Sequence, residues 1–260
     1  MTEKPDFWLD HPPVWELGLS VQTQSSGVLD TYDVRAAHNL FRSELPKVER
    51  HPPVWLMGPD FQHFGPIDPL YRWWFISEEG EHLLQLQENL IARNWRRGKL
   101  TPVDPKEYPG YNNTRDMFRS NIESMRALAN GNLPDPLACE LIYDNFLSLI
   151  DTDGIELKAQ DIFSPIQFSK NSVIREFTMS WNEEIDQSIP ESILRIQSSV
   201  HNVSLKDEPS IPVVRLNFSS KAPINSWDDA FRFFDAAHAN VRRRFLDLTT
   251  EKAHLIWGLK

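Results

Sequence analysis

Cationic and aromatic residues concentrate between positions 93 and 115 of the chain. They are Arg93, Asn94, Trp95, Arg96, Arg97 and Lys99, followed by Tyr108, Tyr111 and Arg115. On an extended strand successive side chains point to opposite faces, so Arg93 and Trp95 share one face and Asn94 and Arg96 share the other. Guanidinium groups beside aromatic rings can stack a base, hold a phosphate or anchor an acidic peptide. The pattern predicts a binding surface, although the same residues also suit an ordinary charged rim of a sheet.

His238 is the histidine best placed for proton transfer. It interrupts the apolar stripe of the last helical segment, and Asp235, Arg242 and Arg244 lie near it along that helix. Proton transfer requires a partner within hydrogen-bond reach. The competing interpretation is a core histidine that hydrogen-bonds a backbone carbonyl or a strand side chain. The three consecutive arginines that begin at Arg242 form a weaker basic candidate, because the dipole favours bases near any helix C-terminus.

Familiar catalytic and cofactor motifs are missing from the sequence. No GxGxxG, GxxxxGK[ST], GxSxG or HExxH pattern occurs, and ten glycines leave few phosphate-binding loops. Cys139, the only cysteine, has the apolar neighbours of a buried strand, where a thiol packs as a small hydrophobe. We therefore expect no cofactor and no metal site. An enzyme that uses His238 with a strand carboxylate ranks last among the functions considered.

The cationic and aromatic run must be positioned by regular elements, and hydrophobic periodicity predicts these. Alternating and apolar runs predict strands at residues 14–22, 72–77, 82–87, 90–96, 139–147, 174–181, 193–200 and 213–218. Helices are predicted after the capping residue Asp30, around Phe118 and Ile122, and after the capping box at Ser226. A weak helical turn is predicted within residues 155–169.

This order of elements predicts an α+β fold made of two similar halves. Each half reads β-α-β-β-β-α, with antiparallel sheets packed against long helices. Residues 1–131 form the first half and residues 137–260 the second, joined by the proline-containing seam at 132–136. We expect both halves to belong to one compact unit. The pattern leaves open whether they share a single sheet.

The composition of the chain indicates which compartment and which classes of partner suit the protein. The formal net charge is −10, with 37 acidic and 27 basic residues, which argues against a general nucleic-acid binder. One cysteine permits no intramolecular disulfide and suits a reducing compartment. The N-terminal residues do not resemble a signal peptide, and no apolar run is long enough to span a membrane. We expect a cytoplasmic protein with no membrane partner.

Several segments resemble a sporadically distributed, uncharacterised family of bacterial proteins of about this length. They are PPVWELGLSVQ near the start, RWWFISEEG with HLLQLQ and NLIARNWRR, YPGY, and AHANVRRRFLDLTTEKAHLIWG at the end. The resemblance implies a bacterial, cytoplasmic, stand-alone protein, without a reaction or catalytic residues to carry over. Its patchy distribution is similar to that of mobile accessory genes, including toxin–antitoxin and phage-defence cassettes.

Two functions follow from these observations. The first is a non-enzymatic protein-interaction protein, such as an antitoxin, a chaperone-like protein or a phage-defence accessory component, because Trp and Phe are abundant and often anchor interfaces. Another protein is then the expected partner, and the seven-residue period of the last helix also permits a homodimer. The alternative is a ligand- or nucleic-acid-binding module that uses the basic and aromatic patch at residues 93–99 and 108–111.

Overall fold

The computed structural model describes residues 9–24, 31–54, 71–97, 108–150, 154–165, 177–184, 191–203 and 211–259. Its strands are β1 Val14–Thr23, β2 Lys47–His51, β3 Arg72–Ile76, β4 His82–Gln87, β5 Leu90–Arg96, β6 Pro136–Ser148, β7 Phe177–Glu184, β8 Ile193–Val203 and β9 Ile211–Pro223. Its helices are α1 Thr31–Phe41, α2 Tyr111–Leu128, α3 Ala159–Ile162, α4 Trp227–Leu248 and α5 Glu251–Ile256. Most of the predicted strands and the three longer helices are confirmed, whereas β2 and α5 were not predicted.

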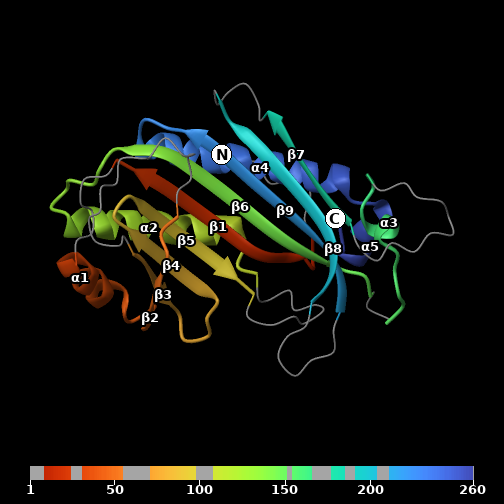
Figure 1. The fold of residues 1–260 in the computed structure, drawn as a ribbon, viewed down its shortest axis with the longest axis horizontal. Helices are drawn as coiled ribbons and strands as arrows, with labels where there is room; N and C mark the ends of the chain where they lie inside the picture. Colours follow the sequence, from red (N-terminus) through yellow and green to blue (C-terminus); the bar gives the residue numbers. More distant parts are fainter. Residues whose placement is uncertain are drawn as a thin grey trace.

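The nine strands of the described ranges form one sheet in the order β2-β3-β4-β5-β1-β6-β9-β8-β7 (Figure 1). Every neighbouring pair is antiparallel. The strands before α2 and those after it meet where β1 pairs with β6, with Leu19 opposite Leu141 and Val21 opposite Cys139. Because β1 and β6 pair with each other, neither group of strands leaves an unpaired edge exposed to solvent at this junction.

The prediction of two similar β-α-β-β-β-α halves is wrong. The strands form a single sheet instead of one sheet per half. Four strands follow α1 but three follow α3, which has only 4 residues against the 11 of α1. Periodicity identifies elements one at a time, whereas the joining of strands depends on backbone hydrogen bonds between segments about 120 residues apart, such as β1 and β6. The predicted seam at 132–136 connects α2 to β6.

Helices α2 and α4 cover one face of the sheet (Figure 1). Phe118 of α2 contacts Phe231 and Phe234 of α4, with ring centroids 6.1 and 6.0 Å apart. Tyr111, at the start of α2, stacks on His238, further along α4. The two helices therefore run antiparallel above the sheet. One hydrophobic core joins them to the central strands, because burial of apolar area is what stabilises an amphipathic helix.

The opposite face of the central strands is polar. Gln85 donates to Asn94 at 2.6 Å, and Asn94 donates to the carboxylate of Glu16 at 2.7 Å. Gly18 lies beneath this row, where an added Cβ would come within 2.7 Å of Asn94 Nδ2. Glycine is thus required there by close approach of a side chain and not by its backbone angles. One-sided coverage by helices is common for antiparallel sheets.

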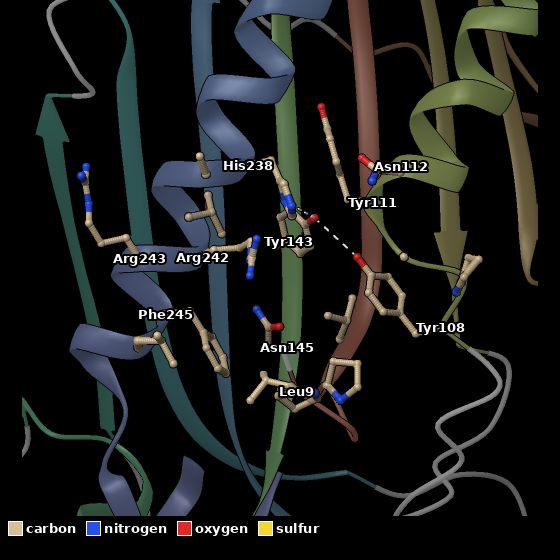
Figure 2. Close-up of a pocket in the computed structure, with 18 of the residues that line it drawn as sticks. Leu9, Tyr108, Tyr111, Asn112, Tyr143, Asn145, His238, Arg242, Arg243 and Phe245 are labelled. Atoms are coloured by element: carbon tan, nitrogen blue, oxygen red, sulfur yellow. Dashed lines mark hydrogen bonds between the residues drawn. The ribbon is translucent and has the colours of Figure 1, made fainter. Parts of the chain in front are cut away.

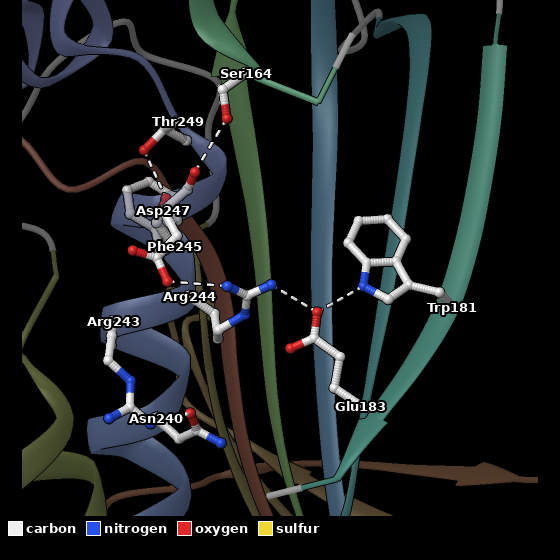
Figure 3. A network of polar contacts seen from close by, with 9 residues as sticks. All are labelled: Ser164, Trp181, Glu183, Asn240, Arg243, Arg244, Phe245, Asp247 and Thr249. Carbon is white, nitrogen blue, oxygen red and sulfur yellow. Dashed lines mark hydrogen bonds and ion pairs between the residues drawn. The ribbon is translucent and has the colours of Figure 1, made fainter.

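Polar contacts attach the C-terminal part of α4 to the edge strand β7 (Figure 3). Arg244 binds Glu183 at 2.6 Å and Asp247 at 2.9 Å. Trp181 donates its indole N–H to the same Glu183 carboxylate at 2.8 Å. At its other end α4 begins at Ser226, whose hydroxyl accepts from the backbone N–H of Asp229, as the predicted capping box requires. None of the described helices has the length and apolar character needed to cross a membrane.

Candidate functional site

A pocket of about 760 Å³ lies between the start of α2, the C-terminal half of α4 and the strands β1 and β6 (Figure 2). We call it the α2–α4 pocket. Its lining residues include Tyr108, Tyr111, Asn112, Tyr143, Asn145, His238, Arg242, Arg243, Leu9, Val14 and Phe245. Its volume falls within the range of small-molecule sites, which is about 300–1,000 Å³.

The segment that leads into α2 brings two of the predicted binding residues to this pocket. Gly110 has a φ of +83°, in the left-handed region that glycine adopts without strain. Tyr108 and Tyr111, on either side of Pro109 and Gly110, both line the cavity. Helix α2 starts here without a side-chain cap and without an acidic residue in its first turn. Its first N–H groups have no acceptor within the helix, so this end carries a partial positive charge.

Tyrosine hydroxyls and His238 form a hydrogen-bonded chain along one wall of the pocket. The hydroxyl oxygens of Tyr108 and Tyr143 are 3.4 Å apart, and the Tyr143 hydroxyl lies 2.7 Å from His238 Nδ1 (Figure 2). Tyr111 stacks on the imidazole at a centroid distance of 4.0 Å. When Tyr143 donates to Nδ1, the other ring nitrogen of His238 keeps its proton and is a donor. The strand hydroxyl confirms the interpretation of His238 as a histidine bonded to a strand side chain.

Burial keeps these groups in their neutral forms. Desolvation, and then the nearby charge of Arg242, lowers the pKa of His238 to about 3. Desolvation raises the pKa of Tyr108 to about 12 and that of Tyr143 well above its ordinary value. A general base works best with a pKa near the pH at which it operates. His238 is therefore a neutral hydrogen-bonding group at pH 7 and a poor proton acceptor.

The side chains of the three consecutive arginines of α4 make different contacts. Arg242 is directed toward Tyr143 and Asn145 within the pocket (Figure 2). Arg243 lies on another side of the helix and donates to Asn240 at 3.0 Å. Arg244 is held by Glu183 and Asp247 at the sheet edge. Arg242 and Arg243 both line the pocket, and the charge of Arg242 contributes to lowering the pKa of His238.

The strand residues of the predicted patch do not form one surface. Arg93 is 0% exposed and pairs with Glu44 at 2.5 Å between the sheet and the helices. Trp95 shares that face, as predicted, and lies fully buried with its ring 5.1 Å from Tyr108. Asn94 belongs to the polar row on the opposite face.

The remaining predicted residues are dispersed as well. Arg96 lies on the polar face, where it donates to the carbonyl of Gly80 at 2.9 Å. Arg97 donates to the carbonyl of Pro12 at 3.5 Å. Arg115 binds Asp235 at 2.7 Å, beside the hydroxyl of Tyr111, which donates to the same carboxylate. Lys99 lies outside the described residues. Among the predicted binding residues that the structure describes, Tyr108 and Tyr111 alone line the pocket.

Sequence reasoning did not identify Leu9, Asn112, Tyr143 or Asn145 as site residues. They come from segments up to about 140 residues apart, and no short motif links them. A weak signal existed for Tyr143, a hydroxyl on the apolar side of an otherwise hydrophobic strand that needs a polar partner when buried. Searching for that partner would have pointed to His238.

No protein-family model matches the chain, and a search of curated proteins finds no match. The resemblance to an uncharacterised bacterial family stays a prediction. In the part of the chain that the structure describes, no group of three or more His, Cys, Asp and Glu side chains is arranged to hold a metal ion. The α2–α4 pocket is therefore interpreted from its own geometry.

Proposed function

We propose that the protein is a non-enzymatic binding module that holds a small molecule carrying negative charge in the α2–α4 pocket. The observation that carries this proposal is the convergence of Arg242, the uncapped start of α2 and the neutral Tyr143–His238 pair on one cavity of about 760 Å³. Donors and a cation around a cavity select anions. This is the ligand-binding alternative from the sequence, moved from the strand of Arg93 to the pocket beside Tyr108 and Tyr111.

Native mass spectrometry of the purified protein tests this proposal. We expect a bound small molecule that is released on denaturation, or a rise in melting temperature with members of an anionic metabolite library. The Ala239→Trp variant places an indole at the pocket wall and should abolish either signal. Leu255→Trp is the matched control, because Leu255 lies outside the pocket on α5 and is 83% exposed. Binding that survives Ala239→Trp as fully as Leu255→Trp would contradict the proposal.

A partner protein is the second candidate function, and the edge strand β7 favours it. In the described part of the chain β7 pairs only with β8, so its other edge presents backbone donors and acceptors. Several of its side chains, among them Thr178 and Ser180, are exposed. An extended segment of another polypeptide can add to such an edge. The test is native isolation with mass spectrometry, comparing the wild-type chain with a Thr178→Lys, Ser180→Lys double variant.

The expected result is a stoichiometric polypeptide that the double variant loses, because charged side chains discourage pairing at a strand edge. Isolation of the wild-type protein without any such polypeptide, at every growth stage and during phage challenge, would count against this candidate. It would leave the pocket proposal untouched.

A further inference from the structure

The two outer strands of the described sheet differ in how well their outer edges are protected. β2 has 5 residues, of which Lys47, Glu49 and Arg50 are charged and exposed. β7 has 8 residues and contains no lysine, arginine or proline, and its two charged residues, Glu183 and Glu184, lie at its C-terminal end. Shortness, charged side chains and proline are the features that keep a sheet edge from pairing with another chain. β2 is therefore a protected edge, whereas most of β7 is not.

The first five residues of β7 are uncharged and accessible on both faces of the sheet. Thr178 and Ser180 are exposed on the polar face. Phe177, Met179 and Trp181 lie on the face that the helices cover, where Met179 is 37% exposed and the two aromatic residues are partly buried. This segment offers a partner strand backbone hydrogen bonds and uncharged side chains together.

The two aromatic rings of this segment are ordered by contacts within the chain. Phe177 stacks on Phe163 with the ring centroids 6.3 Å apart. Trp181 donates its indole N–H to Glu183, which Arg244 also binds (Figure 3). Both rings nevertheless keep an accessible part at the edge of the sheet. Because they are already ordered, they lose little conformational freedom when a partner covers them.

We propose that β7 is the interface of a homodimer, in which it pairs antiparallel with β7 of a second copy of this chain. The inference rests on the second candidate function, because it names the partner that the β7 edge takes. The two-fold axis passes at Met179, which faces Met179 of the second copy. Phe177 then lies opposite Trp181 of the second copy, and Thr178 lies opposite Ser180 of the second copy. By symmetry each of these two pairs occurs twice.

The side chains of β7 select this register. It brings aromatic residues opposite each other on one face and hydroxyl groups opposite each other on the other face, and such cross-strand pairs stabilise a sheet. It places no like charges opposite each other within residues 177–181. An axis at Ser180 would instead set Phe177 opposite Glu183 of the second copy and would separate the aromatic pairs.

The charge of the chain and the other edge of the sheet favour the same arrangement. Two copies that each carry a net charge of −10 repel, and the uncharged segment of β7 lets them meet with the least local repulsion. Pairing of β7 with β7 is a two-fold contact that closes, whereas pairing of β7 with β2 would be head-to-tail and would extend into a filament. The protected β2 edges remain at the two ends of the joined sheet.

Sedimentation velocity of the wild-type chain at about 1–200 μM tests for this dimer without any variant, since a small contact dissociates in this range. We expect the sedimentation coefficient to rise with concentration toward that of a dimer. Met179→Lys places two like charges opposite each other and should raise the dissociation constant at least about tenfold. Val48→Lys is the matched control, because Val48 is also 37% exposed but lies on β2, and it should change the constant less than about twofold.

Cysteine cross-linking tests the register. Cys139 is buried and the pKa of its thiol is raised, so it does not compete. After oxidation with diamide, Met179→Cys should give a covalent dimer, because directly opposite residues lie within disulfide reach, and Val48→Cys should not. A mixture of Thr178→Cys and Ser180→Cys chains should cross-link more than either variant alone, since these two positions face each other.

Each other outcome overturns the homodimer or its interface. A wild-type chain that stays monomeric across the whole concentration range would overturn the homodimer. A dimer that the two lysine variants weaken equally, or that Val48→Lys alone dissociates, would exclude β7 as the interface, as would equal cross-linking of Met179→Cys and Val48→Cys. The second candidate function would survive these results if native isolation found a different polypeptide that the Thr178→Lys, Ser180→Lys variant loses.

Discussion

At the scale of single residues, the environment of a side chain decides its role more than its chemical type does. Arg93 and Arg242 are both arginines within the helix-covered layer, yet Arg93 is fully buried beside Glu44 and Arg242 lines the α2–α4 pocket. Cys139 shows the same dependence, because burial raises the pKa of its thiol far above the physiological range. Such a thiol is unreactive, since the thiolate is the nucleophile.

His238 should make stability depend on pH. Its pKa is lowered to about 3 in the folded chain, against about 6.5 when unfolded, so the unfolded state binds more protons between these values. The stability that His238 contributes is complete above about pH 6.5 and is lost as the pH falls toward 3. Between pH 7 and pH 5 its share of the unfolding free energy should fall by about 2 kcal/mol.

Urea unfolding at several pH values measures this effect. His82 and His254 also have lowered pKa values from desolvation and contribute in the same direction, so the informative quantity is a difference. His238→Gln, which keeps a hydrogen-bonding group near Tyr143, should lose less stability between pH 7 and pH 5 than the wild-type chain. Parallel curves for the two proteins would show that His238 is already protonated or is exposed in the fold.

Gly18→Ala should destabilise the protein through Asn94. The new Cβ would lie 2.7 Å from Asn94 Nδ2 and would displace the amide that donates to Glu16. We expect a loss of about 1–3 kcal/mol in unfolding free energy, measured by urea denaturation. In an Asn94→Ala background the same substitution should cost much less, because the group that it meets is gone. If Gly18→Ala lowered the unfolding free energy equally in both backgrounds, contact with Asn94 would not be the cause of the destabilisation.

At the scale of elements, α4 links the pocket to the far edge of the sheet. One side of the helix carries His238 and Arg242 into the pocket, and Arg244 binds Glu183 on β7 (Figure 3). β7 is an edge strand with one described neighbour, β8, and this ion pair adds a contact from its C-terminal end to the helix layer. The pairing lowers the pKa of Glu183 despite partial burial, consistent with a bound carboxylate.

Arg244→Met should therefore loosen β7. The variant removes charge-assisted hydrogen bonds that are partly shielded from solvent, and about 1 kcal/mol of stability should be lost. Amide hydrogen exchange should accelerate in β7 and less in β9. Arg232→Met is the matched control on the same helix, because Arg232 is largely exposed and pairs with Asp229 three residues earlier. Equal exchange in β7 for both variants would show that the strand does not depend on Arg244.

At the scale of the whole molecule, the pairing of β1 with β6 makes the fold one sheet. Leu19 and Leu141 face each other at this junction and are fully buried beneath the helices. Strands from both predicted halves therefore share a core, and the core residues form one cluster. We expect the chain to unfold as a single cooperative unit.

Leu141→Ala tests this cooperativity. Loss of a fully buried leucine should lower the unfolding free energy by about 2–5 kcal/mol. Hydrogen exchange should then accelerate together in β3–β5 and in β8–β9, which lie on opposite sides of the junction. Ile142→Ala, one residue away on the polar face and only partly buried, should have a smaller effect. Two separate transitions, one for each side of the junction, would contradict a single unit.

The sequence by itself determined most elements and the alternation of side chains within them. Periodicity predicted β1, the three strands from Arg72 to Arg96, and the capped helix α4, because local spacing and capping are properties of short segments. It also placed Arg93 and Trp95 on one face and Asn94 on the other. These features require no knowledge of distant contacts.

Only the tertiary structure decided which face is buried, which strands join and where a site forms. A strand with arginine and tryptophan on one side and asparagine on the other can bury either side, and the choice depends on where α2 and α4 pack. The α2–α4 pocket likewise combines Leu9, Tyr108, Tyr143 and Arg242 from four separate segments. Their proximity results from β1 pairing with β6 and from α4 packing over β6, which are long-range contacts that no local pattern encodes.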